Sequence, residues 1–243
     1  MRKTTALIIP IYLVWAFPLL PTRARGQDSQ RETQKQHKYE MTTYQLCLLV
    51  STSKWNLADF QRLRDAHTVH LKALLSESGK GLIAGPFSDG GKYRGVVVLD
   101  AESIEAARSL AEQDPLVKEG LVTVEAHPWF AAKGIMKKST VLEEMPVYYF
   151  GLLVRGPSWT PGTSPELQAL QTQHMAHMQK TAEAGKLVIA GPLSDSGNIR
   201  GILVYKVASL EEAKALAEAD PAVKAGRFSV EVHPWSVPRA SLP

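Results

Sequence analysis

Residues 84–95 read AGPFSDGGKYRG, and residues 190–201 read AGPLSDSGNIRG. Both stretches contain a Gly-Pro turn, an Asp three residues after the proline, and an Arg-Gly pair. The chain then stays in register and reaches the same letters, HPW, at 127–129 and at 233–235. A repeat this long covers a whole domain, because solenoid repeats are only about 20 to 50 residues long. The sequence therefore predicts that one small domain occurs twice.

The elements predicted within each copy follow the order β-α-β-β-α-β. Apolar runs rich in strand formers predict the strands. The first helix of each copy is expected between a capping residue, Asn56 or Ser164, and a stop at Gly79 or Gly185. The second helices are predicted at 103–114 and 209–220, and the strands at 44–52, 81–87, 93–100, 121–129, 147–156, 186–193, 199–206 and 228–235.

This order of elements is the ferredoxin-like topology, in which an antiparallel sheet carries both helices on one face. The other face needs a cover, and two such sheets can bury these faces against each other. The sequence thus predicts an α+β fold of two tandem ferredoxin-like domains whose sheets pack as an intramolecular dimeric α+β barrel. We expect a monomer with an internal pseudo-dimer, or at most a weak homo-oligomer.

Residues 1–26 differ from the rest of the chain. A short basic start precedes an apolar run, and a small-x-small pattern ends at Gly26, which is the layout of a secretory signal peptide. Pro10 and Pro18 interrupt the run, which is also short for a membrane span. We expect cleavage near Gly26, no stable membrane span afterwards, and a secreted or periplasmic protein. A retained anchor and a true start at Met41 are the alternatives.

Signal cleavage changes the charge of the protein. The whole chain has a net charge of +4 and a pI near 9.1. The signal carries four basic residues and no acidic one, so 28 − 4 = 24 basic residues remain against 24 acidic ones. Nucleic-acid binding depends on clustered excess Lys and Arg, so we expect no nucleic-acid partner. The single cysteine, Cys47, lies in an apolar strand and is expected to be buried and inert.

Composition divides the chain into five segments. The stretch after the signal is polar and lacks a hydrophobic period, which is typical of a linker. A second linker joins the two copies. The predicted segments are a signal peptide at 1–26, a linker at 27–43, a first domain at 44–130, a linker at 131–145 and a second domain at 146–236.

Several motifs of the second copy occur together. They are a His on the first helix, a Gly that ends this helix, the AGP turn, an Asp soon after it, and the pattern A-x-A-D-P-x-V-x-A-G. With these motifs the second copy resembles the YciI-like family, and the first copy does so more loosely. The resemblance implies a ferredoxin-like α+β-barrel fold, dimers, and a His/Asp pair in a pocket. By position, this pair is His174 with Asp195, and His67 with Asp89 in the first copy.

The residues themselves support proton-transfer chemistry. His174 lies on an otherwise apolar helix face, so its ring should point inward. Asp195 follows a strand and a turn, a location where functional groups are often displayed. A carboxylate bonded to one imidazole nitrogen fixes the tautomer and leaves the other nitrogen free to move a proton. We therefore expect His174 to act as general acid/base and Asp195 to orient it. The alternative is a core His bonded to a carboxylate only to satisfy burial.

The first copy is expected to hold a weaker or vestigial site. The segment between His67 and Gly79 is one residue longer than the segment between His174 and Gly185, and this changes the direction in which the ring of His67 is predicted to point. Candidate ligand-binding side chains accompany both sites. They are Ser194 and Arg200 in the second copy and Ser88 and Arg94 in the first. The serines bind either the ligand or the loop backbone, and the arginines hold a substrate carboxylate or pair with a neighbouring Asp.

His70 and His177 complete an H-x-x-H pattern in both copies. Residues three apart share a helix face, and with Asp89 or Asp195 they would supply two imidazoles and a carboxylate. The established helical metal motif is H-E-x-x-H, with four-residue spacing. We therefore expect no metal and no other cofactor, and exposed positions for His70 and His177.

No Ser or Cys fits a nucleophile elbow, so the predicted class is elimination, isomerisation or lactone opening. The sequence thus favours an exported enzyme that acts on a small-molecule substrate through general acid/base chemistry. The alternative is a non-catalytic module that binds a small ligand or a protein. The tryptophans of the HPW motifs are expected to pack between the halves or to cover an end of the barrel.

Overall fold

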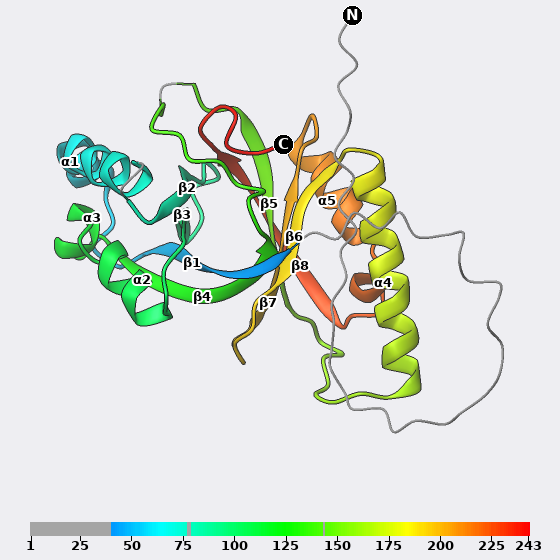
Figure 1. Cartoon of the computed structure of the whole chain (residues 1–243). Helices are drawn as coiled ribbons and strands as arrows, with labels where there is room; N and C mark the ends of the chain where they lie inside the picture. Colours follow the sequence, from blue (N-terminus) through cyan, green and yellow to red (C-terminus); the bar gives the residue numbers. More distant parts are fainter. Residues whose placement is uncertain (1–39, 77–78, 143) are drawn as a thin grey trace, which may run out of the picture.

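The computed structural model describes residues 40–76, 79–142 and 144–243. Its two halves, called repeat 1 (residues 41–132) and repeat 2 (residues 147–236), have the same order of elements (Figure 1). Repeat 1 contains β1 (Met41–Ser51), α1 (Leu57–Leu75), β2 (Gly81–Pro86), β3 (Tyr93–Leu99), α2 (Ile104–Ala111), α3 (Pro115–Lys118) and β4 (Val122–Ala132). Repeat 2 contains β5 (Val147–Arg155), α4 (Pro165–Glu183), β6 (Leu187–Pro192), β7 (Ile199–Tyr205), α5 (Leu210–Glu218), α6 (Pro221–Lys224) and β8 (Phe228–Ser236).

The helices begin where the sequence predicts because a side chain caps each first turn. Asn56 caps α1 and Ser164 caps α4, each accepting a hydrogen bond from the N–H three residues further on. Asp114 and Asp220 cap the short helices α3 and α6, which begin with proline. The Asp-Pro pairs therefore start a new helix, and they place a carboxylate beside the long helix of each repeat.

Each repeat forms a four-stranded antiparallel sheet. The strand order is β2-β3-β1-β4 in repeat 1 and β6-β7-β5-β8 in repeat 2. This is the predicted ferredoxin-like topology. In Figure 1 the helices of the two repeats lie on opposite sides of the molecule and the sheets lie between them. The predicted α+β fold of two tandem domains is confirmed.

Three apolar clusters stabilise the fold. One lies between the two sheets and combines side chains of both repeats, among them Leu46, Val98, Phe150 and Ile202. The other two lie between each sheet and its own helices. Full burial of a side chain such as Phe150 contributes about 1.5–3 kcal/mol. Because the central cluster is shared, the two repeats depend on each other for stability.

The edges of the two sheets are also joined across the repeats. Ser88 and Ser194 donate their N–H groups to the proline carbonyl of the other repeat's HPW motif, at 3.1 and 2.9 Å. The backbones approach so closely that a Cβ on Gly191 would collide with the carbonyl oxygen of Phe130. Both HPW tryptophans are buried in the central cluster, as predicted. The repeated AGP segment, which forms the end of β2 and of β6, therefore serves the closure of the barrel.

Two boundaries bear on the predicted segments. Strand β1 begins at Met41, so residues 41–43, assigned to the linker from composition, pair with β4. The predicted signal peptide, residues 1–26, lies outside the described residues. No helix in the described part of the chain combines the length and the apolar character that a membrane crossing requires.

Candidate functional site

The imidazole of His67 extends from α1 to the Asp-Pro turn that starts α3. Its Nδ1 lies 2.6 Å from Oδ2 of Asp114, and Oδ1 of Asp114 accepts the N–H of Leu116 at 2.9 Å. The Asp114 side chain is only 3% exposed and that of His67 15%. A buried carboxylate with two donors stays in place. It therefore fixes the ring of His67 and favours the tautomer that carries the proton on Nδ1.

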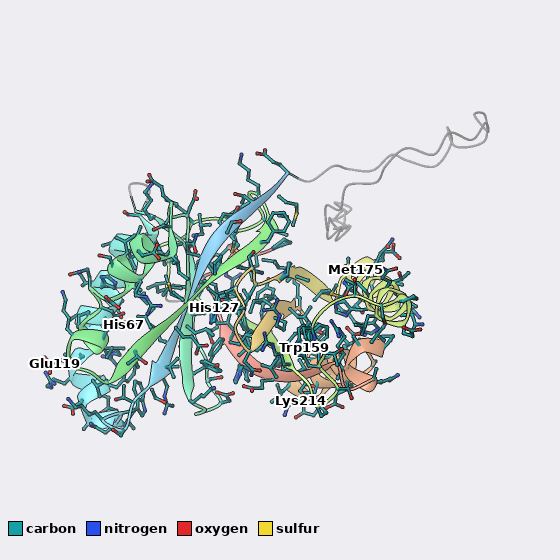
Figure 2. The ribbon with its side chains drawn as sticks, turned by 90° about the horizontal axis from the view of Figure 1, so that it is seen from below. His67, Glu119, His127, Trp159, Met175 and Lys214 are labelled. Atoms are coloured by element: carbon teal, nitrogen blue, oxygen red, sulfur yellow. The ribbon has the colours of Figure 1, made fainter. Side chains whose placement is uncertain are left out.

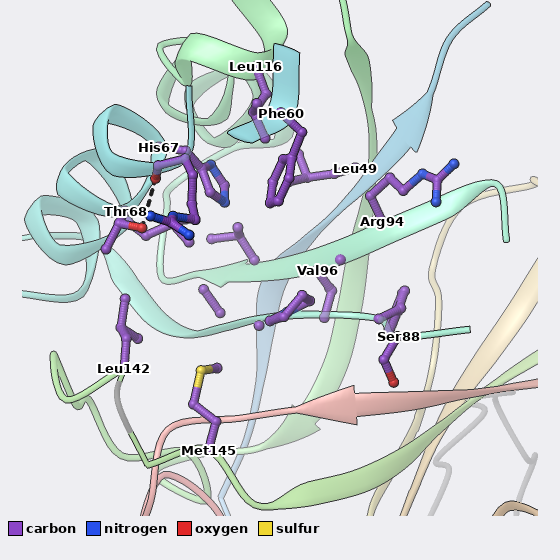
Figure 3. A pocket seen from close by; sticks show the side chains of 18 of the residues that line it. Leu49, Phe60, His67, Thr68, Ser88, Arg94, Val96, Leu116, Leu142 and Met145 are labelled. Carbon is purple, nitrogen blue, oxygen red and sulfur yellow. Dashed lines mark hydrogen bonds between the residues drawn. The ribbon is translucent and has the colours of Figure 1, made fainter. Parts of the chain in front are cut away.

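His67 lies in the wall of a cleft of about 670 Å³ between α1 and the β2–β3 hairpin (Figure 3). Most of the wall is apolar and includes Leu49 and Phe60. Leu142 and Met145, from the segment between the repeats, close one side. A cleft of this volume and lining fits a small organic molecule with few polar groups.

Repeat 2 contains the equivalent pair beside a much smaller cleft. Nδ1 of His174 lies 2.6 Å from Oδ2 of Asp220, but the cleft measures only about 130 Å³. The ring of Phe228 lies 5.8 Å from that of His174, centroid to centroid. Phe228 is the first residue of β8, and Val122 is the first of β4. The larger cleft thus belongs to the site that the sequence ranks second, and the extra residue between His67 and Gly79 leaves the geometry of its pair unchanged.

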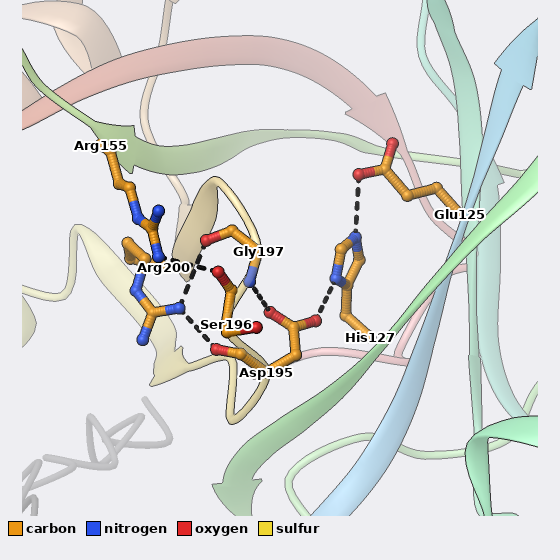
Figure 4. A network of polar contacts seen from close by, with 7 residues as sticks. All are labelled: Glu125, His127, Arg155, Asp195, Ser196, Gly197 and Arg200. Atoms are coloured by element: carbon orange, nitrogen blue, oxygen red, sulfur yellow. Dashed lines mark hydrogen bonds and ion pairs between the residues drawn. The ribbon is translucent and has the colours of Figure 1, made fainter.

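The sequence predicts that Asp195 pairs with His174, but the structure does not bring these two residues together. Oδ2 of Asp195 lies instead 2.5 Å from Nδ1 of His127, in repeat 1 (Figure 4). The reason is the position of the β6–β7 loop. This loop extends from the edge of its sheet where it meets β4, whereas His174 lies on α4, on the outer face of the sheet. The predicted pairing is therefore corrected to His174 with Asp220.

The same exchange occurs at the other edge, where Asp89 contacts His233 at 2.5 Å rather than His67. Oδ1 of Asp89 also accepts the N–H of Gly91 at 3.2 Å. Partial burial alone would raise the pKa of Asp89, but the hydrogen bonds from His233 and Gly91 outweigh it and hold the pKa below its ordinary value. Two His/Asp pairs therefore cross between the repeats.

His127 and His233 are not among the candidates that the sequence selects, because the HPW motif points first to its tryptophans. The recurrence of a His before the same Pro in both copies is the available signal. In Figure 2, His127 lies where the halves meet, whereas His67 and Trp159 lie in separate repeats. Nε2 of His127 faces Glu125 at 3.2 Å. Both ring nitrogens of His127 therefore face a carboxylate, one from each repeat.

The four predicted ligand-binding residues take different places. Ser88 and Arg94 line the large cleft, and Arg200 lines the small one. The guanidinium of Arg94 stacks on Trp55, 4.3 Å from the ring centroid. Ser194 lies at the seam between the repeats. Neither arginine forms an ion pair with a carboxylate of the described residues, so the alternative of simple pairing with Asp does not hold there.

The H-x-x-H pattern does not assemble a metal site among the residues described. Nε2 of His177 bonds the carbonyl oxygen of Leu216 at 2.9 Å, and Nε2 of His70 is buried. In the described ranges no group of three His, Cys, Asp or Glu side chains is placed to hold a metal. That the protein uses no metal and no other cofactor stays a prediction. Burial raises the pKa of Cys47 to about 12, so its thiol is a poor nucleophile.

Comparison with known proteins agrees with the duplicated architecture. A protein-family profile described as YCII-related domain matches residues 45–129 and 157–236. No curated protein matches the sequence. A mutant chlorite dismutase from Candidatus Nitrospira defluvii is 13% identical, with a TM-score of 0.52 over 80% of this chain and 91% of its own. A structure described as putative chlorite dismutase TA0507 is 9% identical, with a TM-score of 0.53 over 82% and 97%.

At such low identities the chlorite dismutase structures show a shared fold and nothing of the chemistry. The family profile is more specific, because it matches each repeat separately and more than half of the chain in total. The matched segments contain both AGP segments and both Asp-Pro pairs. The chain therefore belongs to the YCII-related family and carries its domain twice.

Proposed function

We propose that the protein is a small-molecule enzyme in which His67 transfers a proton to or from a substrate bound in the large cleft. One observation carries the proposal: Nδ1 of His67 is held 2.6 Å from the buried carboxylate of Asp114, in the wall of a cleft of about 670 Å³. With Nδ1 donating to Asp114, the lone pair on Nε2 is available to accept a proton. Asp114 is therefore a positioning residue and His67 the general acid/base.

The lining of the cleft supports a mainly apolar substrate with one acidic group. Arg94 lies in the wall without a carboxylate partner among the described residues, and its buried Nε makes no hydrogen bond to them. A guanidinium of this kind binds a carboxylate well. The Ser88 hydroxyl is a further polar group. Elimination, isomerisation and lactone opening each include a proton transfer that a general acid/base such as His67 can carry out.

Ligand binding without turnover is the second candidate. The observation that favours it is the double use of Asp114, which caps α3 in addition to holding His67. A pair that stabilises the junction of α1 and α3 needs no catalytic role to be useful. In this case the cleft binds the same class of molecule and the ring of His67 forms part of its wall.

Deuterium exchange tests the proposal on a panel of compounds, so the natural substrate does not have to be identified first. The protein is incubated in D2O with small lactones and aromatic carboxylic acids, and both C–H exchange and lactone opening are followed by proton NMR. We expect exchange on at least one compound, and a rate at least about 100-fold lower for His67→Gln. His70→Gln is the matched control, since it changes another half-buried His one turn along the same helix.

Each outcome of this experiment decides between the candidates. Exchange that persists in His67→Gln contradicts the proposed role of His67. Saturable binding with neither C–H exchange nor lactone opening on any compound supports the binding module. A parallel His174→Gln variant reports whether the small cleft of repeat 2 contributes to turnover.

We also propose that the protein is exported and acts as a monomer. Export is supported by the basic start, apolar run and small-x-small pattern of residues 1–26. The monomer is supported by the central cluster, because the apolar sheet face of each repeat is already covered by the other. A second copy is therefore not needed to complete the barrel.

A further inference from the structure

The small cleft of repeat 2 is bordered by a group of arginines around one tryptophan. The guanidinium carbons of Arg227, Arg155 and Arg200 lie 4.4, 5.4 and 5.5 Å from the ring centroid of Trp159. Arg200, Arg227 and Trp159 line the cleft itself, and His174 lies at its inner wall. Three positive charges therefore converge on one small opening.

No carboxylate of the described residues neutralises these arginines. Each donates to a backbone carbonyl instead: Arg155 to Ser196 at 2.8 Å, Arg200 to Asp195 at 2.5 Å, and Arg227 to Thr160 at 3.2 Å. A guanidinium carries five N–H donors, so donors remain for a ligand on each of them.

The nearest carboxylate, that of Asp195, is already occupied. Its oxygens bond His127 and the N–H of Gly197, while Arg200 reaches only its main-chain oxygen (Figure 4). Burial, followed by the charge of Arg155, lowers the pKa of Arg200, and the charge of Asp195 opposes this shift in part.

We infer that this cleft binds a small oxyanion, a carboxylate or phosphate group, held by Arg200 and Arg227 with Arg155 at the rim. Arginine forks match the planar pairs of oxygens in such groups. The volume of about 130 Å³ is well below the roughly 300–1,000 Å³ of sites that enclose a whole organic ligand. The cleft therefore takes a free small anion, or the anionic end of a molecule whose remainder stays outside.

Repeat 1 lacks this site at the equivalent positions. The N–H of Ser51 bonds Lys92 O as that of Arg155 bonds Asn198 O, so Ser51 is the counterpart of Arg155. By the same argument Leu121 is the counterpart of Arg227, because their carbonyls accept equivalent N–H groups from Thr52 and Gly156. Only one arginine–tryptophan contact occurs in both repeats: Arg94 with Trp55 in repeat 1 corresponds to Arg200 with Trp159 in repeat 2. Duplication has therefore produced two clefts of different chemistry.

The indole N–H signal of Trp159, assigned with Trp159→Phe, reports binding in a heteronuclear NMR titration. The probes are inorganic phosphate and acetate, with chloride at the same ionic strength as reference. We expect a saturable shift with at least one probe, and an affinity about tenfold lower for Arg227→Leu and for Arg155→Ser. These variants install the residues of repeat 1. Lys180→Leu, an exposed lysine of α4, is the control for net charge.

The comparison of probes identifies the group, since phosphate binding alone indicates a phosphorylated ligand and acetate binding alone a carboxylate. A Trp159 signal that neither probe moves overturns the inference. So does an affinity equal in wild type and Arg155→Ser, or a shift that chloride reproduces. Arg155 is exposed, so its variant keeps the experiment decisive even if Arg227→Leu fails to fold. None of these results depends on whether His67 is catalytic.

Discussion

Replacing Asp195 by Ala removes the carboxylate that joins the β6–β7 loop to the other repeat, and we expect a marked loss of stability. Oδ2 of Asp195 lies 2.5 Å from Nδ1 of His127, and the side chain of His127 is only 7% exposed. Asp195 also accepts the N–H of Gly197 at 2.9 Å. A hydrogen bond to a charged group contributes about 1.5–3 kcal/mol. The free energy of unfolding should therefore fall by about 2–3 kcal/mol.

A double-mutant cycle in urea unfolding isolates the pair. For Asp195→Ala and His127→Ala we expect a coupling energy of about 1.5–3 kcal/mol, because the two side chains share one bond. For Asp195→Ala and His174→Ala, whose side chains do not meet, the effects should add within about 0.5 kcal/mol. Both repeats should unfold in one transition, since they share the central cluster. Coupling of Asp195 with His174 and none with His127 would refute the crossed pairing.

Asp89→Asn should flatten the acid limb of the stability curve. The folded pKa of Asp89 lies below its ordinary value, so its contribution is complete above about pH 4 and is lost as the pH falls through the folded pKa. Urea unfolding between about pH 2 and pH 6 checks this, and parallel curves for wild type and variant would count against it. Phe228→Val, which installs the residue of repeat 1, should enlarge the small cleft and cost about 1–3 kcal/mol. A crystal structure of the variant measures the cleft, and thermal unfolding measures the loss of stability. A cleft of unchanged volume would contradict this prediction. Light scattering should give the mass of one chain. Intact-mass measurement of the secreted protein should show that it begins near Gln27. A dimer mass contradicts the first expectation, and a retained Met1 the second.

The fold is predictable because its signals are local and occur twice. Ser164 followed by Pro165 marks a helix start wherever it lies, and a loop rich in Ser, Asp and Gly separates two apolar runs in both copies. The order of elements then leaves few topologies. The packing of one sheet on the other follows from their uncovered apolar faces, so the barrel can also be predicted.

The partners of the histidines cannot be predicted in the same way. Position in the motifs assigns His174 to Asp195, but the β6–β7 loop crosses to the other repeat and Asp220 lies closer. Such a crossing depends on how the sheet edges meet, which no local pattern records. In the sequence, the Asp-Pro pairs at 114 and 220 indicate only that a helix ends there. The structure shows that each Asp also bonds a histidine.

Cleft size is equally hidden from the sequence. One of the positions that differ beside the two histidines is the first residue of the last strand, Val122 in β4 and Phe228 in β8. The arginines around Trp159 come from three separate strand or loop segments, and only the sheet register brings them together. These features depend on tertiary distance, so they become visible only in the structure.

The most direct test of the proposed site is the reactivity of the two helix histidines toward diethyl pyrocarbonate. The reagent modifies unprotonated imidazole nitrogen, and mass spectrometry of peptides resolves each residue. The His67 side chain is 15% exposed beside the large cleft, and that of His174 7% beside the small one. We predict that His67 reacts several-fold faster than His174, and that Asp114→Asn changes the rate at His67 and leaves the rate at His174 unchanged. A faster reaction at His174, or a His67 that stays unmodified until the protein unfolds, would contradict the assignment of the site to repeat 1.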